Sequence, residues 1–235
     1  MHDPDARPAI ARLAIIIPAG PGEQAWRGLL PRLAPLAETA EIVVSACGPR
    51  PSGPAEPGFR WLTGPPGRAG QLNRGVAACS APVLWLLHAD SRPGPVALEA
   101  AAHFAGDPPV NPPETIGWFD LAFDDGPRLA RLNARGANLR SALFGLPFGD
   151  QGWLVARRVF DELGGFDPGF GRGEDLDFVV RARRQGVGLT RIGVPLATSA
   201  RRYREHGWLR TTLAHLWLTL ELWNKSRART GKPES

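Results

Sequence analysis

The sequence has few cysteines and no long apolar run. Its 235 residues include two cysteines, Cys47 and Cys79, which have neither the spacing of a zinc site nor the number that a disulfide framework needs. Such a composition is typical of a reducing compartment. No apolar segment approaches the ~20 residues that cross a bilayer, and no charged start leads into an apolar stretch of the signal-peptide type. We therefore expect a cytoplasmic protein.

Acidic residues are scarce toward the C-terminal end. From Arg181 onward the chain has 12 lysines and arginines against 3 acids, whereas residues 1–180 carry a net charge of −4. A basic end favours an anionic partner, which could be a diphosphate, an acidic lipid surface or nucleic acid. It could also be a solvated face. The aromatic residues there follow helical spacing and form no stacking platform, so nucleic acid is disfavoured.

Hydrophobic residues make up 43% of the chain, which is enough for a sizeable core. The order of the patterns predicts a doubly wound α/β sheet that is mostly parallel, with helices on its faces. In the helix at 129–143, Leu129, Leu132, Ala137 and Leu143 share one side. Strands are expected at 13–18, 41–45, 59–62, 83–87, 116–123 and 189–195, and the segment 149–155 leads into another strand. Helices are expected at 23–37, 67–79, 95–104, 129–143, 174–185 and 209–223.

The apolar run at 83–87 leads directly into His88-Ala89-Asp90 and stops at Pro93. Such a run reads as a buried strand, so Asp90 falls at its carboxyl end, where open α/β sheets bind ligands. A carboxylate with an imidazole two residues earlier can hold a divalent cation against a diphosphate. Alternatively, Asp90 caps a turn or the helix that follows Pro93.

Acids open the helix at 174–185. Glu174, Asp175 and Asp177 stabilise its positive end whatever else they do. Carboxylates crowded together also raise one another's pKa, which suits a general base near neutral pH. The sequence alone leaves both interpretations open.

Two arginine-containing segments could bind phosphate. Arg68, in the segment Gly67–Gly75, stands beside the amides of a helix start, which favour an anion. Three arginines at 201, 202 and 204 could neutralise a leaving diphosphate. The alternatives are a solvated arginine in the first case and a surface patch in the second.

Taken together, these segments resemble family 2 glycosyltransferases of the GT-A fold. More narrowly, the chain resembles the compact bacterial branch of radical-SAM/selenodomain-associated glycosyltransferases. The matching segments follow the order of the family over nearly the whole chain: 15–18, 67–75, 86–91, 136–141, 145–152, 164–166, 174–175 and 198–202.

The resemblance implies an inverting transfer of a sugar from a nucleotide-diphosphate donor to a hydroxyl acceptor, which is small or lipid-linked. It implies that Asp90 binds Mg²⁺ or Mn²⁺ at the donor diphosphate. It also implies that Asp175, with Glu174 beside it, deprotonates the acceptor. The expected acceptor or sugar pocket comprises Asp150, Gln151, Arg201 and Arg202. The expected donor site comprises Pro18, Ala19, Glu23, Ser45, Arg68, Gln71, Asn73, His88 and Ala89.

The chain departs from the family at two strand ends. The family's Pro-x-x-Asn-Glu is reduced to Pro18 and Glu23, and its Asp-Gly-Gly-Ser-x-Asp is replaced by the acid-free segment Ser45–Arg50. The lost aspartate would accept a hydrogen bond from a uracil-type N–H, worth about 1–3 kcal/mol when buried. Either the donor carries another base, or the chain is a catalytically degenerate GT-A fold that binds or scaffolds.

The domain organisation follows from the same patterns. Residues 1–205 are predicted to form one GT-A domain, with a nucleotide-binding half (1–110) and an acceptor half (111–205). Residues 206–235 are predicted to be an amphipathic helix with a basic tail. Segment 209–229 is expected to contact the inner face of the plasma membrane peripherally, or else to pack on the domain. Its apolar stripe is Leu209, Leu213, Leu216, Trp217, Leu220 and Trp223.

Overall fold

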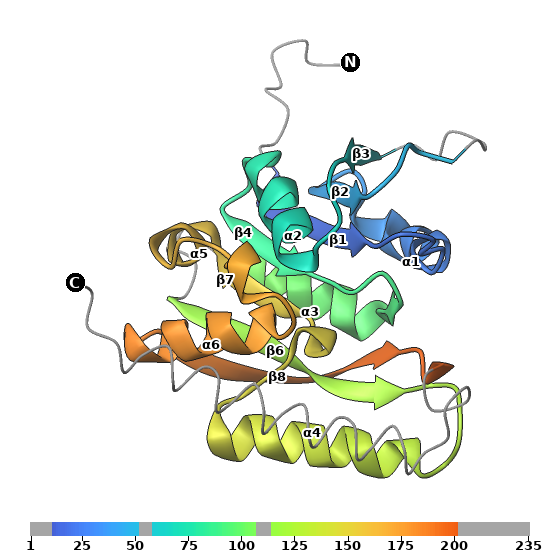
Figure 1. Cartoon of the computed structure of the whole chain (residues 1–235). Coiled ribbons are helices and arrows are strands. Elements are labelled where there is room, and N and C mark those ends of the chain that lie inside the picture. The colour runs from blue at the N-terminus through green and yellow to red at the C-terminus, as the bar shows by residue number, and fades with distance from the viewer. Residues whose placement is uncertain (1–10, 52–57, 107–113, 202–235) are drawn as a thin grey trace, which may run out of the picture.

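The computed structural model describes residues 11–51, 58–106 and 114–201. Within these ranges the chain forms one eight-stranded sheet with helices packed on it (Figure 1). The order across the sheet is β3 (Phe59–Thr63), β2 (Ala40–Ala46), β1 (Leu13–Ala19), β4 (Val83–Leu86), β7 (Trp153–Ala156), β6 (Thr115–Phe123), β8 (Gly188–Thr198) and β5 (Ser91–Arg92).

The N-terminal half is the doubly wound parallel sheet that the sequence predicts. Strand β1 runs parallel to both β2 and β4, and β2 runs parallel to β3. All seven residues of β1 are buried, as expected of a central strand covered on both faces. The helices of this half are α1 (Trp26–Leu33), α2 (Arg68–Ala77) and α3 (Pro95–Gly106), and the short helix η1 (Ala34–Leu36) continues α1.

The C-terminal half makes the sheet mixed. Strand β7 is antiparallel to β4 and β6, β6 is parallel to β8, and β5 is antiparallel to β8. Since Trp153, the first residue of β7, pairs with Leu86, the last residue of β4, the segments before β7 and after β4 meet at one edge. The remaining helices are α4 (Ala130–Phe144), α5 (Arg157–Glu162), α6 (Glu174–Arg184), η2 (Gly149–Gln151) and η3 (Pro168–Phe170).

Each face of the sheet has its own apolar core. Helices α1 and α3 cover one face, and α2, α5 and α6 cover the other, in front of the sheet in Figure 1. On the second face, the ring of Phe178 lies 5.8 Å from that of Trp153 and 4.7 Å from that of Phe166. This aromatic cluster anchors α6 against β7, and it thereby fixes the position of the acids at the start of α6.

Helix α4 turns small side chains toward the rest of the protein and leaves several large apolar side chains exposed. It buries small side chains, Ala130, Ala134 and Ser141. Of the residues that the sequence places on one side, Leu129, Leu132 and Leu143 are exposed and Ala137 is half-buried. The leucine spacing thus marks the outer side of the helix, and small residues let the inner side approach β6 closely.

Three predictions from the sequence concern residues that the structure does not describe. The helix at 209–223, its membrane contact and the role of Arg202 lie outside the described residues. Among the described residues, no helix is long and apolar enough to span a membrane.

Candidate functional site

His88 and Asp90 lie in the turn that follows β4. The turn is closed by the amide of Ser91, which donates to the carbonyl oxygen of His88 at 3.1 Å. His88 Nδ1 stands 3.9 Å from Asp90 Oδ1, and both side chains are about 30% exposed, at 28% and 31%. An imidazole and a carboxylate therefore lie together at the carboxyl end of the parallel half of the sheet.

Asp150 lies close to this turn because β7 pairs with β4. Burial raises the pKa of Asp150 to about 6, and the nearby carboxylates of Asp175 and Asp90 raise it further against the opposing charges of Arg140 and Arg68. Asp175 and Asp90 are therefore close enough to Asp150 for their charges to act on it. An acid with such a pKa changes charge close to physiological pH.

Glu174 and Asp175 begin α6 after Gly173, whose positive φ of 91° reverses the chain there. Glu174 is buried, and its Oε1 pairs with Arg68 Nη1 at 3.0 Å, whereas Asp175 Oδ2 lies 3.8 Å from the same nitrogen. Asp175 accepts backbone hydrogen bonds from Gly149 at 3.0 Å and Leu176 at 2.9 Å. These bonds fix its orientation, so Asp175 is a positioned and partly accessible carboxylate.

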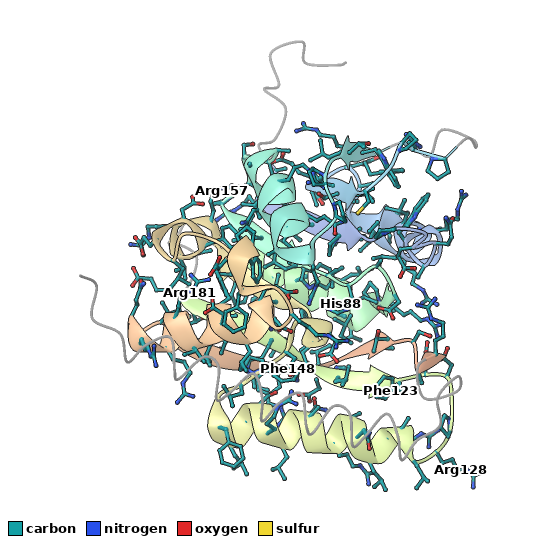
Figure 2. All side chains as sticks on the ribbon, in the orientation of Figure 1. His88, Phe123, Arg128, Phe148, Arg157 and Arg181 are labelled. Carbon is teal, nitrogen blue, oxygen red and sulfur yellow. The ribbon has the colours of Figure 1, made fainter. Side chains whose placement is uncertain are left out.

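Arg140 completes the charged cluster from α4. Its guanidinium stacks over the Phe148 ring at 3.8 Å, and Nε donates to the carbonyl oxygen of Leu146 at 3.2 Å. Burial lowers the pKa of Arg140, while Asp150 and Asp175 counteract the shift. The labels in Figure 2 mark Phe148 and His88 near the centre of the molecule. We call Asp150, Glu174 and Asp175 the acidic cluster. Arg68 and Arg140 are the two arginines beside it.

A pocket of about 260 Å³ also includes Asp90 in its lining. Three arginines line it, Arg32 from α1, Arg92 from β5 and Arg201 after β8. Arg92 is held by Asp124 at 2.5 Å and Asp125 at 3.0 Å. The hydroxyl of Ser91, which also lines the pocket, is buried and has no hydrogen-bond partner among the described residues. This arginine pocket suits an anion.

Gln71 braces the ends of β1 and β2. Its side-chain amide donates to the carbonyl oxygens of Ala19 at 2.7 Å and Ser45 at 2.8 Å. Gln71 and Ser45 are both buried, and the hydroxyl of Ser45 has no hydrogen-bond partner among the described residues. The predicted donor residues Pro18 and Ala19 close β1 beside this brace.

Glu23 occupies the loop between β1 and α1. Its Oε1 accepts hydrogen bonds from the amides of Gln24 at 2.8 Å and Ala25 at 2.7 Å. Its Oε2 lies 3.9 Å from Arg201 Nη2, which joins this loop to the segment after β8. Glu23 therefore positions one wall of the arginine pocket.

The side chains of Asn73 and Gln151, which belong to the segments that match the family, form hydrogen bonds within the fold. The side chain of Asn73 donates to and accepts from the backbone of Phe166, at 2.8 and 3.0 Å. Gln151 has no exposed surface, and it binds Phe119, Asn138, Ser141 and Phe148. Asn73 and Gln151 therefore stabilise the fold around the site. Gln151 and Ala89 are buried, and Asn73 is half-buried.

The sequence patterns assign no role to Arg32, Arg92 or Arg140. Arg92 stands two residues after Asp90, and this closeness in the sequence could have indicated that both residues belong to one site. Arg140 lies inside the matching segment 136–141, but only the packing of α4 shows that it faces Asp150. Arg32 follows no pattern that would have singled it out.

The residues present fit a cation that takes most of its ligands from a substrate. Among the described residues, no group of three or more histidine, cysteine or acidic side chains is arranged to hold a metal. Asp90 and His88 offer one oxygen and one nitrogen. Mg²⁺ is commonly bound by one or two carboxylates together with substrate phosphates, and the adjacent arginine pocket provides room for such phosphates.

Solved structures show a similar fold. Glucosyl-3-phosphoglycerate synthase from Mycobacterium tuberculosis matches with a TM-score of 0.57 and 20% identity, over 96% of this chain and 80% of that one. TarS from S. aureus matches with a TM-score of 0.60 and 12% identity, over 80% and 60%. A mannosyltransferase from Pyrobaculum calidifontis matches with a TM-score of 0.56 and 16% identity, over 83% and 59%.

These likenesses establish the GT-A, Rossmann-like fold of the chain. The chain spans only about three fifths of the TarS and mannosyltransferase structures. No protein-family model matches the sequence, and no curated protein matches it.

Proposed function

We propose that the protein is an inverting glycosyltransferase of family 2 that moves a sugar from a nucleotide-diphosphate donor to a hydroxyl acceptor. The observation that carries the proposal is the position of Asp90. It lines the arginine pocket, and its charge also acts on Asp150 in the acidic cluster. Such a transfer needs both features, a place for a leaving diphosphate and a base for an attacking hydroxyl.

Asp175 is the proposed base. Arg68 pairs more closely with Glu174 than with Asp175, so Glu174 positions the arginine and Asp175 keeps the more accessible carboxylate. The acceptor proton passes to Asp175 as the acceptor oxygen attacks the anomeric carbon. The bond from that carbon to the diphosphate oxygen breaks on the opposite face, and its electron pair leaves with the diphosphate. The configuration of the sugar is therefore inverted.

The arginine pocket is the proposed site of the leaving group. Arg32 and Arg201 would neutralise charge on the diphosphate, while Arg92 is kept in place by Asp124 and Asp125. A divalent cation, Mg²⁺ or Mn²⁺, held by Asp90 and His88 would stabilise the same charge.

The solved structures support this donor class. The glucosyl-3-phosphoglycerate synthase was crystallised with Mn²⁺, UDP and phosphoglyceric acid, and the mannosyltransferase with GDP-Man and Mn²⁺. The end of β2 lacks the acid that would accept a hydrogen bond from uracil, and Ser45 there is buried. We infer that the base of the nucleotide is recognised differently here.

The finer features of the proposal follow from the sequence. The chain is assigned to the bacterial radical-SAM/selenodomain-associated branch and to the cytoplasm, with segment 209–229 contacting the inner face of the plasma membrane. Its acceptor is small or lipid-linked. The basic, apolar-striped character of 209–229 supports the membrane contact.

A binding or scaffolding role is the second candidate. It is favoured by the acid-free segment Ser45–Arg50 at the end of β2. Such a protein would bind a nucleotide diphosphate without turning over a sugar.

Transfer assays with a panel of nucleotide sugars and hydroxyl acceptors test the proposal. We expect Asp175→Asn to lower the rate by about 10²–10⁴-fold, because a general base contributes that much. Asp90→Asn should also lower it strongly. Asp161→Asn, the same change at an exposed aspartate of α5, is the matched control and should leave the transfer rate unchanged.

Full transfer by both site variants would refute the site assignment. Binding of nucleotide diphosphates by the wild type without transfer from any sugar would favour the scaffolding alternative.

A further inference from the structure

Exposed apolar side chains are concentrated along α4. Six large apolar side chains are exposed in the described part of the chain, and all but Val96 lie in or next to this helix. Leu132, Leu139 and Leu143 are 52%, 59% and 66% exposed, and Phe144 is 61% exposed. The spacings of seven and four residues put the three leucines on one line along the helix. Arg135 and Gly136 separate Leu132 from Leu139, and Leu139 and Leu143 are neighbours on successive turns. Exposed leucines gathered on one side of a helix call for a partner.

The inner side of α4 explains why these leucines face outward. Ala130, Ala134 and Ser141 are buried against the sheet. Asn138 also faces inward, and it donates to and accepts from the backbone of Leu121 in β6, at 3.1 and 2.8 Å. A helix anchored by small and polar residues on its inner side has no structural need for leucines on its outer side.

Arginines flank the exposed leucines. Arg128, Arg131 and Arg135 are exposed, and Figure 2 shows Arg128 at the margin of the molecule beside the start of α4. Arg131 and Arg135 are four residues apart, so they form a second line next to the leucines. The sequence has no acidic residue from 128 to 149. The outer face of α4, defined by Leu132, Leu139, Leu143, Phe144 and these three arginines, is both apolar and positively charged.

We propose that the outer face of α4 docks on an anionic lipid bilayer. Leucines and phenylalanine that enter the boundary between headgroups and acyl chains, with arginines at the headgroups, are the composition of an interfacial helix. Two protein occupants would be opposed by charge. A second copy would set arginine against arginine, and residues 202–235 carry seven basic residues against three acidic ones.

The outer face of α4 belongs to the same helix as Arg140, a residue of the candidate site. Arg140, on α4, is close enough to Asp150 for its charge to act on that carboxyl group. A helix is about 10 Å across, so a bilayer on the outer face would lie close to the acidic cluster. The proposal depends only on this surface, and it holds or fails independently of the proposed activity.

Vesicle flotation of the full chain tests the proposal. We expect binding to vesicles of phosphatidylcholine with phosphatidylserine, and much weaker binding to phosphatidylcholine alone. Leu139→Ser with Leu143→Ser should weaken the partition about tenfold or more, because two apolar insertions are lost. Val96→Ser, at an equally exposed apolar residue of α3, is the matched control and should change nothing.

The charge of the face is tested in the same assay. Arg131→Gln with Arg135→Gln should weaken binding to the anionic vesicles by about fivefold for each arginine. Arg12→Gln, at an exposed arginine just before β1, should have little effect.

An environment-sensitive fluorophore then locates the contact. Leu139→Cys, in a background of Cys47→Ser and Cys79→Ser, should carry a label whose emission shifts to the blue when anionic vesicles are added. The same label at Val96→Cys should not respond. Circular dichroism confirms that each variant is folded.

Three results would overturn the proposal. The first is the absence of binding to anionic vesicles. The second is binding without a response at position 139, which would assign the contact to another surface such as 209–229. The third is a blue shift that rises with protein concentration in the absence of lipid, which would show that a second copy covers α4.

Discussion

Asp150 is the carboxyl group whose environment matters most at the scale of single residues. Its pKa is raised to about 6, first by burial and then by neighbouring carboxylates. Between its ordinary pKa of 3.8 and about pH 6 the folded state keeps a proton that the unfolded state releases. The free energy of unfolding therefore falls as the pH rises through this window, by about 3 kcal/mol in total.

Asp150→Asn removes this titration while keeping the shape of the side chain. We expect the variant to match the wild type near pH 4 and to be more stable by up to about 3 kcal/mol above pH 6.5. Thermal and urea denaturation from pH 4 to 7 measure the difference. A stability difference that is the same at every pH would contradict the environment described for Asp150. Asp161→Asn, at an exposed position, should show no such pH dependence.

The sequence predicted the positions of Asp90 and Asp175 in the fold better than it predicted the contacts of the amides Gln71 and Asn73. Asp90 and Asp175 could be predicted because each follows a local signal, the end of an apolar run and the start of a helix. Gln71 and Asn73 belong to the same matching segment as Arg68, yet both bind the backbone of other elements. Amides suit ligands and backbone equally well, so residue type and spacing could not separate these uses.

At the scale of elements, the approach of α2 to β1 controls the placement of Arg68. Gly75, on the buried side of α2, leaves no space for a side chain, because an added Cβ would overlap Cγ2 of Ile16. Gly70, in the same helix, has nothing within 4 Å of an added Cβ. The two glycines thus provide a matched pair.

We expect Gly75→Ala to lower the free energy of unfolding by about 1–3 kcal/mol, since overpacking forces β1 and α2 apart. Gly70→Ala should raise it by up to about 1 kcal/mol, because alanine favours the helix. Urea denaturation of both variants makes the comparison. Equal effects of the two substitutions would show that α2 does not pack tightly on β1.

Helix α4 shows what periodicity can and cannot predict. The spacing of Leu129, Leu132 and Leu143 predicted a helix at 129–143, and α4 confirms it at 130–144. The same spacing could not tell which side of the helix meets the sheet. That choice depends on small residues such as Ala134 and on β6, which lies next to the helix only in the fold.

The whole molecule combines two sheet halves of different kinds. Alternating strands and helices predicted the parallel half, because such connections allow few arrangements. The antiparallel insertion of β7 between β4 and β6 could not be predicted from local patterns, since it depends on pairing between distant segments. This insertion brings Asp150 to Asp90, so the site is a product of the topology.

The central claim is that Asp90 and the adjacent arginine pocket bind a nucleotide diphosphate together with a divalent cation. Its most direct test is the melting temperature of the full chain with a panel of nucleoside diphosphates, with and without Mn²⁺. A ligand at 100 times its Kd adds about 2.7 kcal/mol to the stability of a native protein, which corresponds here to a shift of about 5–10 °C.

We predict such a shift for at least one nucleoside diphosphate in the presence of Mn²⁺. It should be lost in Asp90→Asn and kept in Asp161→Asn. The account would be contradicted if no nucleoside diphosphate shifted the melting temperature, or if Asp90→Asn showed the same shift as the wild type.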